Sequence, residues 1–390
     1  MFNTQNIKFN SYKFKKIKKT LKNINNKWFN QFGIIKTLKA DYKYSYNKKI
    51  IKKLRRYNTF RIIGMGGSIL GTEAIHQFLN HKIKKKFIFF NNLQNRNNIQ
   101  LNNKKIFNII VSKSGDTLET IINANKLINQ STKNNLFIIG NNVSYLNLLA
   151  KKLKSEIIEH KNFVGGRYSV LSEVGMLPAE LMGFNEKKFK RFNYLIKKKS
   201  FVNFLIKNVN ETISLVKKRK SNSIILNYDE NSDNFFKWYQ QLISESLGKK
   251  SKGILPIISS MPKDNHSLLQ LYLDGPKNNF FTFFSVKDKK SIKLNNKLVI
   301  DYQYYLKNKS IGQVIESQKK ATQNVFFQKK IPFRNIEVKN RNEESIGELF
   351  CFFMLETILL GRALGVNPFD QPSVELVKTE TKKYLVNSKK

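Results

Sequence analysis

Residues 60–68 read F-R-I-I-G-M-G-G-S, a short apolar run that leads directly into a glycine-rich turn. The residues that follow, from about Ser68 to Leu79, predict a helix. Glycines permit tight turns and close approach of the backbone to a ligand, and a helix N-terminus offers N–H groups to an anion. The spacing differs from the dinucleotide fingerprint G-x-G-x-x-G. The stretch therefore predicts the beginning of an α/β unit, with a plain tight turn as the alternative for the motif alone.

Further apolar runs alternate with helical stretches on both sides of a charged segment at 185–200. The first group comprises K-F-I-F-F, I-F-N-I-I-V and L-F-I-I-G, with helices at 117–128 and 143–153. The second comprises a helix at 201–219, S-I-I-L-N-Y, a helix at 235–247, G-I-L-P-I-I, F-F-T-F-F-S-V and R-N-I-E-V. Such alternation predicts parallel sheets covered by helices on both faces.

The predicted fold class is therefore α/β, with two doubly wound parallel-sheet domains in tandem, each of three αβα layers. Helices extend the chain at both ends, and the apolar helix 346–364 and a helix near 373–385 close it. The predicted divisions are an N-terminal helical arm at 1–55, a first domain at 56–183, a second domain at 184–345 and a C-terminal helical segment at 346–390. Hydrophobic residues make up 41 % of the 390, which is enough to build two cores.

The chain is strongly basic, with 71 Lys and Arg against 27 Asp and Glu and a net charge of +44. Clustered basic residues would indicate nucleic acid, but here the charge is spread evenly and accompanies abundant Asn, Ile, Phe and Tyr, which favours a compositional bias. The single cysteine, Cys351, excludes an internal disulfide and favours a cytoplasmic setting. We find no secretory signal, and the run 349–364 is too short and too interrupted to favour a membrane span.

Two further motifs combine hydroxyl groups or arginine with glycine. Ser112-Lys113-Ser114-Gly115-Asp116-Thr117 follows the strand I-F-N-I-I-V, at the end of a parallel strand where open α/β sheets bind ligands. Its hydroxyls suit a phosphate monoester, while helix capping by Ser114, Asp116 or Thr117 is a compatible alternative. Gly165-Gly166-Arg167 presents an arginine that could hold an oxyanion or could simply lie on the surface.

Three polar motifs follow later in the chain: E-S-L-G-K at 245–249, D-N-H-S at 264–267 and Q-P-S-V-E-L-V-K at 371–378. Each alone could be ordinary helix-end or loop polarity. The four histidines show no metal-ligand spacing, so no metal site is expected.

Taken in order, these motifs resemble the glucose-6-phosphate isomerase family. The segments that carry the resemblance span 64–378: G-M-G-G-S, S-K-S-G-D-T-L-E-T, G-G-R-Y-S-V-L-S, E-S-L-G-K, D-N-H-S and N-P-F-D-Q-P-S-V-E-L-V-K. The first two indicate only the broader sugar-isomerase (SIS) fold, and the last four in this order are more specific. The resemblance implies two SIS domains and interconversion of glucose 6-phosphate and fructose 6-phosphate in glycolysis and gluconeogenesis, without cofactor or metal.

The resemblance also implies a role for each site residue. Phosphate binding falls to Ser112, Ser114 and Thr117, with Lys113 contributing locally, while Gly67 and Ser68 line the sugar pocket. Glu245 shuttles the proton between C1 and C2, and Arg167 stabilises the enediolate. His266 and Lys378 assist ring opening, and Gln371 contacts the substrate. Family members are homodimers in which the histidine of the D-N-H-S motif serves the other subunit's site. Gly115, Asp116 and Asn265 depart from the usual family residues.

Three rival functions fit parts of the pattern. A bifunctional phosphoglucose/phosphomannose isomerase would also turn over mannose 6-phosphate. A sugar-phosphate-binding regulator would keep the hydroxyl loop without needing Glu245, Arg167 or Lys378. A nucleic-acid-binding protein would explain the charge but none of the motifs.

The even spread of charge predicts that binding to duplex DNA is weak and falls steeply with salt, because it rests on phosphate contacts alone. Filter binding at increasing ionic strength measures this. Sequence-specific binding that survives about 0.2 M salt would contradict the prediction.

Overall fold

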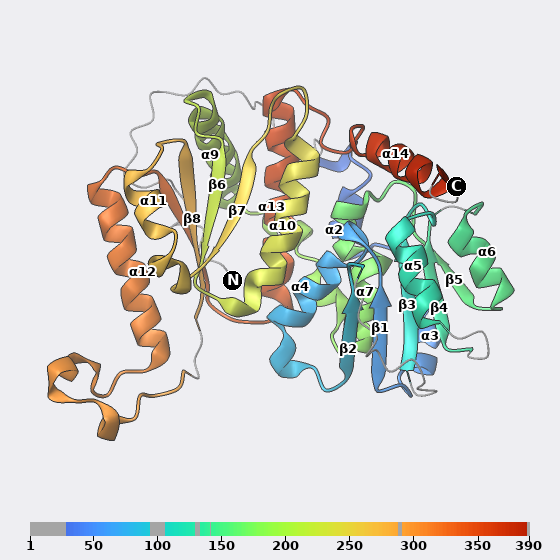
Figure 1. Ribbon diagram of the computed structural model, residues 1–390, viewed down its shortest axis with the longest axis horizontal. Coiled ribbons are helices and arrows are strands. Elements are labelled where there is room, and N and C mark those ends of the chain that lie inside the picture. Colours follow the sequence, from blue (N-terminus) through green and yellow to red (C-terminus); the bar gives the residue numbers. More distant parts are fainter. Residues whose placement is uncertain (1–28, 94–105, 129–132, 141, 288–290, 388–390) are drawn as a thin grey trace.

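The computed structural model of the protein describes residues 29–93, 106–128, 133–140, 142–287 and 291–387 (Figure 1). Two parallel sheets lie side by side, each covered by helices. Residues 1–28 of the predicted N-terminal arm lie outside the described ranges. The rest of the arm includes the short helices α2 (Ile35–Leu38) and α3 (Lys48–Leu54).

The first sheet has the strand order β2-β1-β3-β4-β5, and every pair is parallel. Its strands are β1 (Thr59–Ile63), β2 (Lys86–Phe90), β3 (Ile106–Ser112), β4 (Asn135–Ile139) and β5 (Glu156–Glu159). The helices around it are α4 (Leu70–Phe78), α5 (Leu118–Leu127), α6 (Tyr145–Lys152) and α7 (Glu173–Leu181).

Alternate residues of these strands enter separate cores on the two faces of the sheet. Ile62 and Ile109 belong to the large core with α4 and α7, while Ile63 and Ile110 pack with α5 and α6. Burial on both faces explains why the strands read as continuous apolar runs. The predicted three-layer α/β unit is confirmed.

The second sheet has the parallel order β7-β6-β8-β9. Its strands are β6 (Asn222–Asn227), β7 (Leu255–Ser260), β8 (Asn279–Val286) and β9 (Phe333–Val338). The helices that follow the first unit are α8 (Phe192–Ile196), α9 (Lys199–Lys217), α10 (Asp233–Leu247), α11 (Leu269–Asp274), α12 (Ile311–Gln328), α13 (Glu343–Leu364) and α14 (Val374–Asn387). All strands fall inside the ranges 56–183 and 184–345, whose boundaries stay a prediction.

The sequence did not indicate helix α12, which covers the second sheet on the side away from α10 (Figure 1). Only Lys319, Thr322 and Phe326 of its residues are buried. Phe326 packs edge-on against Phe281 with ring centroids 4.8 Å apart. One buried aromatic ring holds an otherwise polar helix in place, so its apolar periodicity is too weak to see in the sequence.

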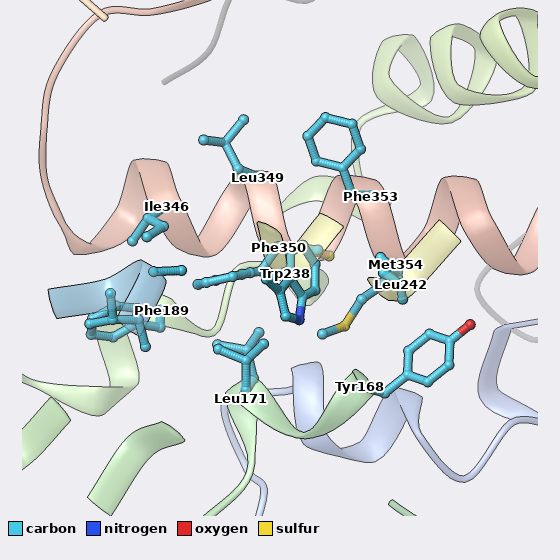
Figure 2. Packing of buried hydrophobic residues seen from close by; sticks show 14 of the residues in the cluster. Tyr168, Leu171, Phe189, Trp238, Leu242, Ile346, Leu349, Phe350, Phe353 and Met354 are labelled. Carbon is cyan, nitrogen blue, oxygen red and sulfur yellow. The ribbon is translucent and has the colours of Figure 1, made fainter. Parts of the chain in front are cut away.

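Helices α10 and α13 form the core between the two sheets. Trp238 of α10 stands edge-on to Phe350 of α13, with ring centroids 4.7 Å apart. Figure 2 shows both residues within this core. On its other side α10 packs against α4 of the first sheet. The prediction of a buried helix at 346–364 is confirmed, since nearly every residue of α13 is buried. Among the described residues no helix is long and apolar enough to cross a membrane.

The charged segment at 185–200 is part of the core and more than a connector. The Lys190 ammonium is buried and donates hydrogen bonds to the carbonyl oxygens of Thr37, at 2.5 Å, and Leu171. It also lies 4.9 Å and 5.0 Å from the ring centroids of Tyr42 and Tyr44. Burial lowers the pKa of Lys190 to about 7. This side chain fastens the N-terminal segment to the first unit.

A buried ion pair joins the second sheet to α13. Arg334 of β9 donates to Glu356 at 2.5 Å and to the Thr282 hydroxyl at 2.8 Å, and the Asn208 amide also donates to Glu356. Both charged side chains are 2 % exposed. A charge this deep is stable only while its partner is present.

We predict that Glu356→Ala lowers the free energy of unfolding by about 3–5 kcal/mol, because the buried Arg334 charge loses its carboxylate. Urea denaturation measures the change. The control is Glu380→Ala on α14, whose exposed pair with Lys383 should contribute less than about 1 kcal/mol. Equal effects of the two substitutions would contradict the prediction.

Candidate active site

The candidate site lies where the central strands of the first sheet end. Ile63 of β1 pairs with Ile110 of β3, so the segments that follow both strands emerge at the same edge. The short 3₁₀ helix η2 (Gly66–Ser68) follows β1, and the hydroxyl loop, defined as residues 112–117, begins at the last residue of β3. This edge of a parallel sheet is where ligands bind in open α/β folds.

Gly67 allows η2 to touch the 3₁₀ helix η4 (Gly166–Leu171), which carries Arg167. A Cβ atom at Gly67 would lie 2.1 Å from the Gly166 carbonyl carbon and 2.4 Å from the Arg167 nitrogen. The Ser169 hydroxyl then donates to the Gly67 carbonyl at 3.0 Å. A tight turn alone would not require this, so glycine at 67 serves a close approach between two backbones.

Arg167 is buried and lies at the centre of the site. Its side chain is 3 % exposed, which excludes the alternative of a surface arginine. The guanidinium donates five hydrogen bonds: to the Ser246 hydroxyl at 2.8 Å, Glu245 Oε2 at 3.2 Å, Gln371 Oε1 at 2.6 Å, and the carbonyls of Pro368 at 2.7 Å and Asp370 at 3.0 Å. Every nitrogen of the group is therefore used, which compensates the burial of its charge.

Glu245 lies in the last turn of α10, with its side chain 28 % exposed. Its Oε2 accepts from Arg167, and its Oε1 accepts from the Gln241 amide at 2.9 Å. Both oxygens are thus oriented while part of the carboxylate stays accessible to a substrate. The arrangement holds a base beside a fixed cation, the combination that proton transfer next to a carbonyl requires.

The sequence did not single out the residues that support this pair. Gln241 stands one helical turn before Glu245, and that spacing of four could have been noticed. Ser246 lies inside the E-S-L-G-K motif, where its hydroxyl meets both Arg167 and, at 3.1 Å, the Tyr168 hydroxyl. Trp238 donates from its indole nitrogen to the Arg167 carbonyl at 3.1 Å. No sequence signal indicates that last contact.

The hydroxyl loop brings together the three predicted phosphate-binding hydroxyls. Thr117 Oγ1 lies 3.0 Å from Ser112 Oγ and 3.4 Å from Ser114 Oγ. Thr117 is the N-cap residue of α5, but its side chain makes no capping hydrogen bond. The capping alternative is therefore wrong for Thr117, and its hydroxyl belongs to the cluster instead.

The two unusual residues of this loop have structural partners. Gly115 has φ +73°, and a Cβ atom there would lie 2.0 Å from the Ser144 hydroxyl oxygen. The Asp116 carboxylate accepts from the Tyr145 backbone N–H at 2.8 Å, at the start of α6. The contacts at Gly115 and Asp116 attach the loop to the neighbouring helix.

Lys113 connects the hydroxyl loop to the wall of the site. Its ammonium donates to the Asn162 carbonyl at 2.9 Å. Its pKa is lowered, first by burial and then by the positive charge of Arg167. Lys113 of the hydroxyl loop thus lies within electrostatic range of Arg167. Ser68, also predicted to line the sugar pocket, is buried in η2 beside Gly67.

Two of the predicted residues, His266 and Lys378, are exposed. His266 is exposed in η7 (Lys263–His266), a loop fastened by Asp264, which accepts from the Ser259 hydroxyl at 2.9 Å. Lys378 is exposed on α14 and donates to Glu375 at 2.6 Å, and α14 buries none of its residues. The hydrogen bonds and ion pairs of Arg167 and Glu245 described above include neither side chain, so the roles of His266 and Lys378 stay predictions.

The part of the chain that the structure describes contains no group of three or more His, Cys, Asp and Glu side chains arranged to hold a metal ion.

Fold and site together define a class: α/β proteins with two parallel sheets and a hydroxyl-lined sheet edge, in which a buried arginine is paired with a carboxylate. Solved structures share the fold. A hypothetical protein of Thermus thermophilus superposes with a TM-score of 0.77 at 21 % identity, covering 90 % of each chain. A glucose-6-phosphate isomerase of Chlamydia trachomatis superposes with a TM-score of 0.71 at 18 % identity, covering 88 % of this chain and 72 % of its own.

Sequence comparison places the chain more narrowly. The phosphoglucose isomerase family model matches residues 52–390. The chain is 31 % identical to a probable glucose-6-phosphate isomerase of Methanococcus maripaludis, over 92 % of this chain and 85 % of the relative. It is 32 % identical to the glucose-6-phosphate isomerase of Methanocaldococcus jannaschii, over 85 % of each. The chain belongs to the phosphoglucose isomerase family.

We predict that Gly67→Ala lowers kcat/KM about 100-fold, because the added methyl group displaces the Arg167 backbone by a fraction of an ångström or more. The matched control is Gly165→Ala, where a Cβ atom meets only the Tyr168 ring edge at 3.6 Å. Steady-state kinetics of both variants test the contact. Equal activities would show that the approach of Gly67 to Gly166 is unimportant.

Proposed function

We propose that the protein interconverts glucose 6-phosphate and fructose 6-phosphate through an enediolate, with Glu245 as the proton shuttle. Membership of the phosphoglucose isomerase family supports the reaction. The observation that supports the residue is the contact of Glu245 with the buried Arg167, at 3.2 Å, in a partly open site.

The chemistry needs few groups. Isomerisation removes a proton from the carbon beside the carbonyl and returns it to the neighbouring carbon, so one carboxylate can perform both transfers. Negative charge then develops on the carbonyl oxygen. Arg167 is charged and is held in place by five hydrogen bonds, which occupy all five of its N–H groups. It would stabilise that oxygen through its charge, or the substrate would replace one of the acceptors Glu245 and Gln371. Gln371 would contact the sugar from beside Arg167, since the two already share a hydrogen bond.

The non-reacting end of the substrate would sit on the hydroxyl loop. Ser112, Ser114 and Thr117 offer three hydroxyl donors close together, and the first N–H groups of α5 lie next to them. Neutral donors suit this role, because they bind a phosphate dianion without competing with Arg167 for Glu245. Lys113 adds a positive charge at the edge of the loop.

Ring opening is assigned to His266 and Lys378, and it would require both to approach the site. For His266 we propose that a second copy of the chain supplies it, in a homodimer whose sites are shared. Its exposure on the second unit supports this assignment. A two-fold dimer presents each His266 to the other chain's site in the same way. The alternative is that His266 folds back into the site of its own chain.

The single cysteine, Cys351, is buried and unpaired, which fits a cytoplasmic location.

We predict that Glu245→Gln lowers kcat by about 10²–10⁴-fold or more while substrate binding stays nearly normal, because the amide keeps the shape but accepts no proton. A coupled assay of fructose 6-phosphate conversion measures kcat. Glu230→Gln, an exposed substitution of the same chemistry, is the control. Near-normal turnover of the Glu245 variant would remove Glu245 from this role.

By contrast, Ser114→Ala should mainly raise KM, since it weakens binding of the non-reacting phosphate.

The shared site predicts complementation between two inactive variants, Glu245→Gln and His266→Ala. A mixed dimer has one site with both lesions and one with neither, so subunit exchange should restore part of the activity. Native mass measurement establishes that mixed dimers have formed. If mixed dimers form and no activity returns, each His266 serves its own chain.

A further inference from the structure

A second cationic cavity opens at the edge of the second sheet where its strands begin. Lys220 precedes β6 by two residues, Lys277 precedes β8 by two, and Lys330 precedes β9 by three. Since these strands are parallel, their amino ends gather the three connections at one edge. The lysines surround a cavity of about 250 Å³, and its apolar wall includes Phe281 and Pro332. The candidate active site lies instead at the carboxyl edge of the first sheet.

Backbone carbonyls orient two of the ammonium groups at this cavity. Lys220 donates to the carbonyl of Lys277, and Lys277 donates to the carbonyl of Leu273 at 3.0 Å. Carbonyl oxygens fix the direction of an ammonium group and leave its full charge. The carboxylate that lies nearby, Asp274, is bonded to Lys329 at 2.8 Å. The lysines at the cavity therefore keep a net positive charge.

Burial lowers the pKa of Lys220, and the positive charges of Lys277 and Lys218 lower it further. A half-buried ammonium beside other cations is electrostatically unfavourable, and a bound anion would relieve that repulsion. Lysine is abundant throughout the chain, but a solvated lysine needs neither a cavity nor a fixed orientation. This convergence from three connections is a specific feature of the fold.

We propose that this cavity, lined by Lys220, Lys277, Lys329 and Lys330, binds a small phosphate-bearing anion. Its volume admits a small molecule and excludes a helix or a folded partner. The ammonium groups provide point charges for phosphate oxygens, and the apolar wall provides a surface for the uncharged part of a ligand. The site is separate from the sugar-phosphate site and does not depend on the proposed reaction.

The test measures binding of inorganic tripolyphosphate by titration calorimetry, with fructose 6-phosphate present at saturation so that the active site is filled. Three proteins are compared: the unmodified chain, Lys220→Met with Lys277→Met, and Lys151→Met with Lys152→Met. The last pair removes the same charge from the exposed end of α6. We expect the cavity variant to bind about tenfold or more weakly, because two charge-assisted contacts are lost, and the α6 variant to bind normally.

Two results would overturn the proposal. They are equal affinities in the cavity and α6 variants, and loss of binding in Lys277→Arg, which keeps the charge. Circular dichroism establishes that the double variant is folded. If the double variant is unfolded, tripolyphosphate binding is measured for the exposed single substitutions Lys277→Glu and Lys330→Glu. We expect each of them to abolish binding.

Discussion

The site depends on the buried charge of Arg167. A guanidinium that is 3 % exposed is stable only when its donors are satisfied, and here the acceptors come from the end of α10 and from the segment after α13. The hydrogen bonds that satisfy Arg167 in this structure also bring Glu245 and Gln371 together. The same hydrogen bonds stabilise the fold and place the residues that the proposed reaction uses.

The support for Arg167 continues into the core between the sheets. Trp238 donates to the Arg167 carbonyl and packs against Phe350, which lies beside it in Figure 2. Gly67 lets η2 lie directly on η4. Helix α10 contacts both α4 and α13, so helices from both sheets fix the position of Glu245 at its end. The site thus belongs to neither sheet alone. Close packing at this junction keeps a carboxylate and a cation at a fixed separation, which catalysis by preorganised charge requires.

Two edges of the molecule offer different environments to phosphate. At the hydroxyl loop the donors are neutral hydroxyls and the N-terminus of α5, with Lys113 and Arg167 nearby. At the amino edge of the second sheet the donors are ammonium groups held by carbonyls. Neutral donors in a fixed geometry favour recognition of one orientation, whereas ammonium groups act as point charges that recognise charge more than shape. In these two proposals the high positive charge of the chain is used in chemically distinct ways.

Local preferences in the sequence were enough to predict the alternation of strands and helices and the glycine-rich turns. The roles of Arg167, Glu245 and the hydroxyl loop came from the resemblance to a known family, and they stay predictions. Apolar runs are buried on both faces of a sheet, and glycine stands where backbones meet. The same reasoning missed α12, whose burial rests on Phe326, and it missed the supporting residues Gln241, Ser246 and Trp238. The meeting of Arg167 with Glu245 and Gln371, which lie 78 and 204 positions away along the chain, became visible only in the folded molecule. Contacts across such separations depend on how α10 packs between two sheets, and no local pattern of residues encodes that packing.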